Sequence, residues 1–325
     1  MSVRTKFSAG LVSALAIACL LGWPSTAAGA DETGSRTEGI SFTFPQATPD
    51  YTGGATNASR FSLRLYGGFS RIGAADLNAG FDGYYELIEL YEALGFGTVT
   101  GGYTPLKNGF NGGADVIYQI TPRIGIGVGA GYLRTSANSL ATLSIEEDVI
   151  DFPATATLSA IPIRLGVFLA FPLGGKLNLT ADAGAAYYAA LKLDATQRLE
   201  FDDGDWLEMS INAQRSSFAN LGFQGSLGLE YMVSPKMGLF VEALGRYARF
   251  KNFETATGSN RNSDGDSDST EGKIYLMTKT FTEGSWSMFT VEETPPVSSP
   301  PSTVFTEPKI DLSGFSLQAG IRIRF

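Results

Sequence analysis

Charged side chains stand at alternate positions within apolar segments of this chain, and they are its first candidates for chemistry. Four are basic and four are acidic, so a shared interior would let them pair, whereas an unpaired buried charge is costly. Three roles stay open for them: a structural plug of ion pairs, a gate or narrow ion path, and a catalytic cluster. The eight are Arg64, Asp115, Arg164, Asp182, Glu230, Glu242, Arg246 and Arg322.

Catalysis has little support among these residues. The chain contains no histidine, which removes every histidine base, nucleophile partner and metal ligand. Two carboxylates can still act as acid and base, and Glu230 and Glu242 on neighbouring segments are the candidates for such a pair. We predict no catalytic residues, no cofactor and a protein that is not an enzyme.

A cluster of aspartates begins like a calcium-binding loop. Asp264, Asp266 and Asp268 have the spacing of its first ligands. Ser269 then stands where the loop needs glycine, and Tyr275 stands where the closing glutamate belongs. We therefore predict a solvated acidic loop and no metal site.

The eight charges belong to segments in which apolar residues alternate with polar or small ones. A period of two marks a strand with two different faces. Short turns containing proline or glycine alternate with long connections, the arrangement of an outer-membrane barrel with both termini in the periplasm. The segments are 61–70, 110–119, 124–132, 161–171, 177–187, 221–233, 239–247 and 315–325. The short turns lie at 121–123, 172–175 and 234–237, and the long connections at 71–108, 135–158, 193–220 and 251–311.

The apolar face of these strands is the one that must meet lipid. A soluble barrel points its apolar face inward, but here the other face carries the charges, and a closed barrel in lipid pairs every backbone group without water. Aromatic residues near the two ends of a strand lie ~8 to 10 residues apart, or roughly 20–25 Å in height, as in the aromatic girdles of membrane barrels. We predict an all-β, transmembrane, antiparallel up-and-down barrel of about eight strands, with the charges in its lumen.

Structure is also expected within the long loops. Tyr84, Leu87, Ile88, Tyr91 and Leu94 recur at helical spacing. Asp82 can cap the start of this helix, and Gly95 follows its end. Its apolar face would pack on the barrel mouth as a lid, or contact outer-leaflet lipid or a partner.

Two further hairpins are predicted in the third and fourth long loops. Residues 202–205 suit a hairpin tip, and the runs 273–279 and 286–292 suit a hairpin above the membrane. If these strands joined the wall, the barrel would have ~10 or 12 strands and a wider lumen.

The N-terminus carries an export signal. Arg4 and Lys6 precede an apolar stretch, and Ala28-Gly29-Ala30 is a small-x-small cleavage site. We predict a cleaved signal peptide at 1–30, a disordered periplasmic arm at 31–59 and a barrel at 60–325. The net charge of −9 becomes −11 when the two signal-peptide cations are removed, which gives no attraction to nucleic acid.

The C-terminal strand carries a family resemblance. Phe315, Leu317, Ile321, Ile323 and Phe325 alternate up to a terminal aromatic residue, which resembles the signal that the barrel-insertion machinery recognises in outer-membrane proteins. Residues 60–325 as a whole resemble the small barrels of the OmpA, OmpX and OmpW type, although no peptidoglycan-binding domain follows. The barrel enzymes that are similar in outline each rely on a histidine.

The resemblance implies an outer-membrane location, with outer-membrane lipid, lipopolysaccharide and the insertion machinery as partners. We expect a non-enzymatic protein with a structural or surface-interaction role, whose surface ligand the sequence does not identify. The alternative is a small passive pore for ions or small solutes.

Overall fold

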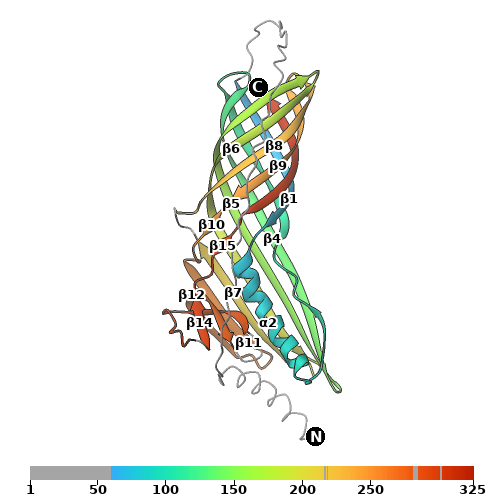
Figure 1. Cartoon of the computed structure of the whole chain (residues 1–325), viewed down its shortest axis with the longest axis vertical. Helices are drawn as coiled ribbons and strands as arrows, with labels where there is room; N and C mark the ends of the chain where they lie inside the picture. Colours follow the sequence, from blue (N-terminus) through green and yellow to red (C-terminus); the bar gives the residue numbers. More distant parts are fainter. Residues whose placement is uncertain (1–59, 216, 218, 281–284, 301) are drawn as a thin grey trace, which may run out of the picture.

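The computed structural model describes residues 60–325, apart from 216, 218, 281–284 and 301. The predicted signal peptide and periplasmic arm therefore lie outside the described residues. Two regions follow one another along the long axis of the molecule, a barrel and a wider β-rich domain (Figure 1).

Eight antiparallel strands close into a ring, which confirms the predicted barrel and its strand number. Each strand pairs with the next, and the last returns to the first through pairs such as Leu63 with Ile323. In ring order they are β1 (Phe61–Ile72), β3 (Asn108–Gln119), β4 (Ile124–Ile145), β5 (Asp148–Gly174), β6 (Leu177–Phe201), β8 (Leu221–Ser234), β9 (Met237–Tyr247) and β16 (Gly314–Arg324).

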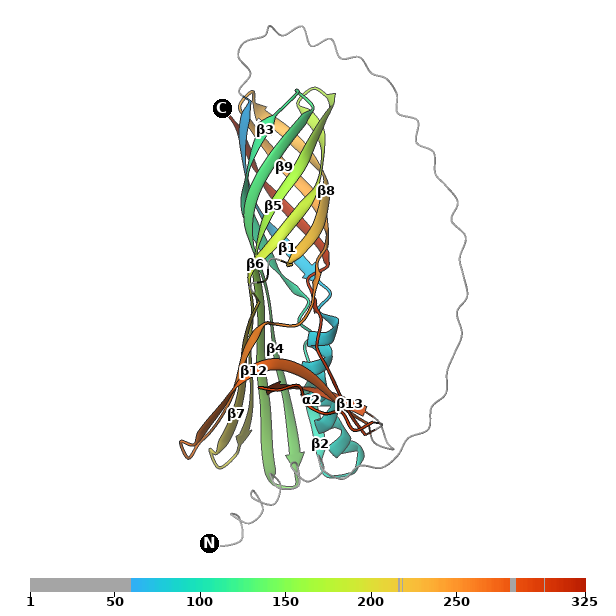
Figure 2. The ribbon, with the colours of Figure 1, turned by 90° about the vertical axis from the view of Figure 1, so that its left-hand side faces the viewer.

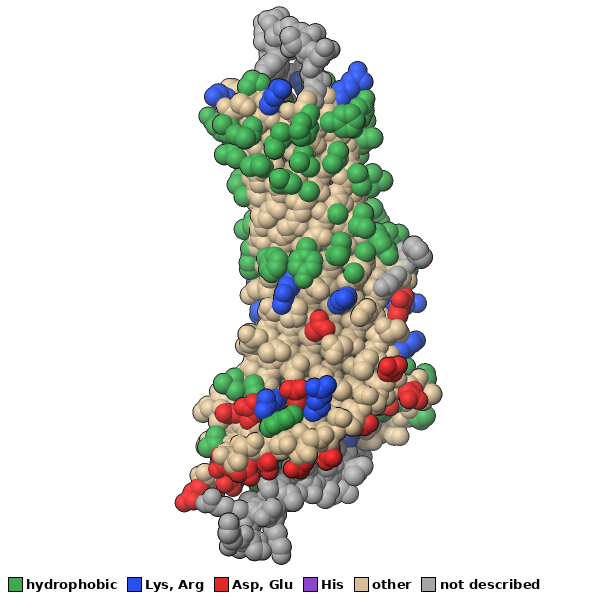
Figure 3. Space-filling view, turned by 180° about the vertical axis from the view of Figure 1, so that it is seen from behind, with side chains coloured by type: hydrophobic (Ala, Val, Ile, Leu, Met, Phe, Trp, Pro, Cys, Tyr) green, Lys and Arg blue, Asp and Glu red, His purple; other side chains and the backbone are tan. Residues whose placement is uncertain are grey.

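The outer wall of the barrel is apolar. Leu165 and Phe223 expose 66% and 65% of their surface, although both are residues that soluble proteins bury. Hydrophobic side chains are spread over the barrel in Figure 3, whereas the visible acidic side chains gather on the other region. Among the described residues, no helix is both long and apolar enough to cross a membrane.

Strands β4, β5 and β6 do not end at the rim of the barrel. They continue beyond it and carry further strands and a helix, which together we call the distal domain (Figure 2). Its sheet adds β7 (Trp206–Arg215), β11 (Thr255–Asn262), β12 (Ser267–Thr280) and β13 (Ser285–Glu292) to the edge of β6, while β2 (Thr98–Gly102) pairs with β4 and β14 (Thr303–Thr306) with β12. The short strands β10 (Arg249–Phe250) and β15 (Ile310–Asp311) pair with each other.

The predicted hairpins belong to this distal domain. Strand β6 ends at Phe201 and β7 begins at Trp206, which places the tip at 202–205 as expected. Lys279 of β12 pairs with Trp286 of β13. None of these strands enters the ring, so the barrel keeps eight strands and does not widen to 10 or 12.

One helix, α2 (Ala75–Ala93), lies along the distal domain, and it begins earlier than the sequence predicts. Asp82 is inside the helix and does not cap it; the N-cap is Ala74, which makes no side-chain cap. Leu77 and Phe81 extend the buried face by two turns, so packing outweighs the missing cap. Gly95 follows the helix with a φ of +79°, as predicted.

The helix packs against β13 and is not a lid on the barrel mouth, which corrects that expectation. Phe81 meets Phe289 edge to face at 5.1 Å between ring centroids. A Cβ at Gly83 would lie 1.7 Å from the carbonyl oxygen of Ser287, so the helix can approach the strand this closely only through glycine.

Candidate functional site in the barrel lumen

The structure places all eight sequence-predicted charges inside the barrel. Each exposes 9% of its surface or less. They come from seven of the eight strands, and on each strand they occupy positions whose side chains alternate toward the lumen. We call them the luminal charge cluster. They lie on β1 (Arg64), β3 (Asp115), β5 (Arg164), β6 (Asp182), β8 (Glu230), β9 (Glu242 and Arg246) and β16 (Arg322).

Five of the eight form a network across the middle of the lumen. Arg64 donates to Glu242 at 2.5 Å and lies 3.5 Å from Asp182. Arg164 makes two hydrogen bonds to Asp115, one of them from Nε at 2.5 Å. Arg164 also lies 3.9 Å from Asp182, which joins the two arginines through a shared carboxylate.

Neutral residues complete the hydrogen bonding of the acids. Ser226 donates to Asp182 and lies 3.2 Å from Glu242. Gln318 donates to Glu242 through Nε2. A buried carboxylate keeps its charge only when such partners replace water, so this set has the composition of a satisfied network.

Aromatic rings fill the space around the two arginines. The Arg64 guanidinium lies 4.2 Å from the centroid of the Phe240 ring, and Arg164 lies 5.1 Å from that of Tyr66. Phe168 lies 5.4 Å from each arginine. These rings lie on the same inward face of their strands as the charges. They are absent from the sequence-predicted site, because an aromatic side chain alone does not indicate one.

The glycines of β4 make room for these side chains. Gly125, Gly127, Gly129 and Gly131 occupy successive inward positions on one strand. A Cβ at Gly129 would lie 1.9 Å from Oδ1 of Asp115, and one at Gly127 would lie 2.8 Å from the Phe168 ring. One side of the lumen is therefore bare backbone, against which the charges and rings pack.

A second group lies nearer the end of the barrel where the chain terminates. Glu230 accepts two hydrogen bonds from Arg324, at 2.8 and 2.9 Å, and lies 3.9 Å from Arg322. The sequence-based set omitted Arg324, although it has the same inward parity as Arg322. Its position two residues after Arg322, on the same face of the strand, could have identified Arg324 from the sequence.

Arg246 lies apart from both groups. It donates to the carbonyl oxygen of Leu312 at 2.8 Å and to Ser70 at 3.0 Å. These neutral partners lie toward the distal domain, so the three parts of the luminal charge cluster follow one another along the barrel.

Luminal side chains fill most of the space inside the barrel. Cavities of about 10 and 20 Å³ lie within it, the first beside Arg64 and Asp182, the second beside Arg164 and Arg246. A cavity needs roughly 10–15 Å³ to hold one water molecule. Spaces of this size hold single water molecules.

The two glutamates of the candidate carboxylate pair belong to different groups. Glu242 belongs to the central network with Arg64, and Glu230 belongs to the terminal group with Arg324. In the distal domain, Asp266 hydrogen-bonds Asn262 within a turn. Across the described residues no group of three or more Asp, Glu, Cys or His side chains is placed to hold a metal ion.

Two solved structures and one family model are similar to this chain. A structural search finds the outer membrane protein OprG from Pseudomonas aeruginosa, at 11% identity and a TM-score of 0.30, with 82% of this chain and 96% of that chain covered. It also finds the outer membrane protease OmpT from Escherichia coli, at 8% identity and a TM-score of 0.26, with 84% and 99% covered. No curated protein matches the sequence. The family model of the outer membrane protein beta-barrel domain matches residues 15–271, and the chain belongs to that family.

Proposed function

We propose that this protein is a non-enzymatic outer-membrane anchor that displays the distal domain outside the cell. The observation that carries the proposal is the combination of a lumen filled by side chains with strands that continue into a second folded region. Strands β4, β5 and β6 extend to 22, 27 and 25 residues, whereas ~9–11 residues suffice to cross a membrane. The extra length builds the distal domain.

The orientation follows from the connections. The barrel has short turns at the end where the chain terminates and the distal domain at the other. Outer-membrane barrels keep short turns in the periplasm and long loops outside. The distal domain would then stand above lipopolysaccharide, which together with outer-membrane lipid is the partner expected from its position.

The C-terminal residues support assembly by the barrel-insertion machinery. Phe315 and Leu317 expose 48% and 58% of their surface on the outer wall of β16, and Phe325, directly after the strand, exposes 60%. Ile321 and Ile323 share that face and pair with Leu65 and Leu63. An apolar row ending in an exposed aromatic residue remains available for recognition before the barrel enters lipid.

The rival function is a small passive pore. The luminal charge cluster spans the lumen, so its ion pairs could act as a gate that opens when the pairs separate. Separating a buried ion pair leaves two charges without partners, at a cost of several kcal/mol per ion, which favours the closed state and therefore the anchor.

Single-channel recording in a planar bilayer separates the two functions. Wild type, Arg164→Ala and Glu242→Ala would be compared, with Thr155→Ala on the outer face of the distal domain as the matched control. The anchor predicts no steady conductance from wild type or control. A steady wild-type conductance that changes in the two luminal variants and not in Thr155→Ala would replace the anchor with a charge-lined pore.

A further inference from the structure

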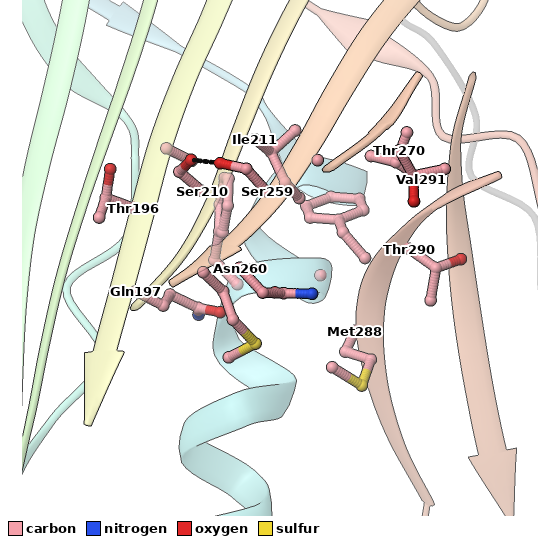
Figure 4. A pocket seen from close by; sticks show the side chains of 16 residues that line it. Thr196, Gln197, Ser210, Ile211, Ser259, Asn260, Thr270, Met288, Thr290 and Val291 are labelled. Carbon is pink, nitrogen blue, oxygen red and sulfur yellow. Dashed lines mark hydrogen bonds between the residues drawn. The ribbon is translucent and has the colours of Figure 1, made fainter. Parts of the chain in front are cut away.

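The distal domain encloses a cavity of about 250 Å³ between its sheet, helix α2 and β13 (Figure 4). This volume lies just below the roughly 300–1,000 Å³ of pockets that accept drug-sized ligands. Asn260 at its edge is exposed to solvent, whereas Phe81 and Phe289 inside are buried. The cavity therefore runs from an accessible edge into the interior of the domain.

On the floor of the cavity, a row of three side chains crosses three strands, with an amide on each side of a methionine. Gln197 of β6 pairs in register with Met209 of β7, and Met209 pairs with Asn260 of β11. The three side chains share one face of the sheet, and Figure 4 shows the two amides projecting into the same space. The next row is Ala195, Ile211, Gly258 and Thr270.

Gln197 stands out because its neighbours on the same face of β6 are apolar. Leu193, Ala195 and Leu199 expose 0%, 6% and 5% of their surface and belong to the core. Within the described part of the chain, Nε2 of Gln197 is buried and has no hydrogen-bond partner. A buried unpaired amide costs free energy, so a donor kept at this position is suited to a ligand.

The opposite wall is apolar and aromatic. Phe81 of α2 and Phe289 of β13 form an edge-to-face pair. Val291 reaches over Gly258, where an added Cβ would lie 3.1 Å away. The ligand would thus meet ring and aliphatic surface on one side and the amides of Gln197 and Asn260 on the other.

None of the 16 residues that line the cavity carries a charge. A charged ligand would lose its hydration without gaining an ionic partner. Each amide offers a donor and an acceptor, which matches two adjacent hydroxyl groups of a ligand. The phenylalanine rings can cover an apolar face of the same ligand. A neutral sugar has hydroxyl groups, an apolar C–H face and a size just below that of drug-like molecules.

We propose that this cavity binds one neutral monosaccharide unit, with Gln197 and Asn260 as its hydrogen-bonding residues. The inference deepens the proposed function, on which it rests, because a displayed domain gives the site access to sugars outside the cell. It assigns the site no reaction.

Saturation-transfer NMR on the full chain refolded in detergent micelles tests the site. The probes are D-glucose, D-galactose and N-acetyl-D-glucosamine, with glucuronate and glucosamine as charged comparisons. We expect at least one neutral sugar to bind and both charged sugars to give no signal. Failure of all three neutral probes, or equal binding of the charged ones, overturns the proposal.

Two matched variants locate the binding. Gln197→Leu keeps the side-chain size and removes the amide, so we expect Kd to rise by about tenfold or more, while the melting temperature stays level or rises because the unpaired amide is gone. Gln214→Leu makes the same change at an exposed position of β7 outside the cavity lining and should leave Kd unchanged. Equal binding by the two variants contradicts the assignment.

Bilayer recording on the same preparations keeps the two proposals separable. If the barrel does not conduct and no neutral sugar binds, the sugar-site proposal is wrong and the anchor proposal stands. If a neutral sugar binds and the barrel conducts steadily, the closed-anchor proposal is wrong and the sugar-site proposal stands.

Discussion

The barrel and the distal domain share strands β4, β5 and β6, which have opposite chemistry in the two regions. In the barrel, Arg164 points inward and Leu165 outward, whereas further along β5 Leu158 is buried and Thr155 is exposed. The same alternation thus serves two solvents, lipid around the barrel and water around the distal domain. The switch in residue type between 159 and 161 marks where the wall leaves the membrane.

Strand β6 makes this transition differently from β4 and β5. Inward positions are even-numbered in the barrel, as at Asp182 and Tyr188, but odd-numbered in the distal domain, as at Leu191 and Leu193. The register with β5 shifts here, and Ala190 adopts a φ of +47°. An irregularity at one residue therefore exchanges the two faces of the strand.

The largest expected effect comes from breaking an ion pair in the barrel interior. Asp115→Ala leaves Arg164 buried without its main partner, so we expect a loss of about 3–5 kcal/mol in the free energy of unfolding, measured by urea titration in lipid vesicles. In the distal domain, Glu200→Ala removes a partner of Arg198 from a pair that is about 40% exposed and should cost at most about 1 kcal/mol.

The double variant Asp115→Leu with Arg164→Met sharpens that test. Replacing both charges by apolar side chains leaves no unpaired partner, so stability should recover most of the loss. A double variant as unstable as Asp115→Ala would mean that the pair is needed for more than charge balance.

A charge on the outer wall should distinguish lipid from water along one strand. Leu165→Arg places a cation in the apolar band and should cost about 2–4 kcal/mol. Thr155→Arg makes a comparable change on the exposed face of the distal domain and should stay within about 0.5 kcal/mol of wild type. Similar losses at the two positions, measured in the same vesicles, would contradict the proposed membrane boundary.

The irregularity in β6 predicts a smaller effect. An L-residue in the left-handed region costs roughly 1–2 kcal/mol. Glycine avoids this strain, but it loses more conformational entropy on folding, which offsets part of the gain. Ala190→Gly should therefore stabilise the protein by about 1 kcal/mol or less. A clear destabilisation in urea titration would show that the left-handed conformation is not the native one.

The smallest effect concerns pH and belongs to helix α2. Burial raises the pKa of Asp82, and burial together with Asp82 and Glu89 raises that of Glu86. Both acids hold a proton more tightly in the folded state. Their contribution to the free energy of unfolding is therefore full below about pH 4 and is lost as the pH rises through the raised pKa values. Asp82→Asn should weaken this decline, and its urea midpoint should approach that of wild type in acid. A midpoint difference independent of pH would contradict this.

Alternation was enough to predict the barrel from sequence, because one face of each strand must meet lipid. It also placed Arg64 and its seven companions on the inward face. It did not predict how they divide into groups, since the partner of Glu230 is Arg324, 94 residues away, and such pairings depend on the register of the closed ring.

The distal domain was harder to predict for a physical reason. Its strands are polar on the outer face, as water requires, so they resemble loops next to the apolar barrel segments. The pairing of β7 with β11 joins segments separated by the whole of β8 and β9. Helix α2 likewise begins at Ala75 through packing of Leu77 and Phe81, and no local cap marks that start.

Cysteine labelling of intact cells tests the central claim most directly, because the single native cysteine, Cys19, lies in the predicted signal peptide. Thr155→Cys probes the outer face of the distal domain, and Ser226→Cys probes the lumen, where Ser226 is buried. With a maleimide that does not cross membranes, a closed anchor with an external domain predicts labelling at 155 and none at 226. Labelling at 226 would show an open lumen, and no labelling at 155 would show that the distal domain is not displayed outside the cell.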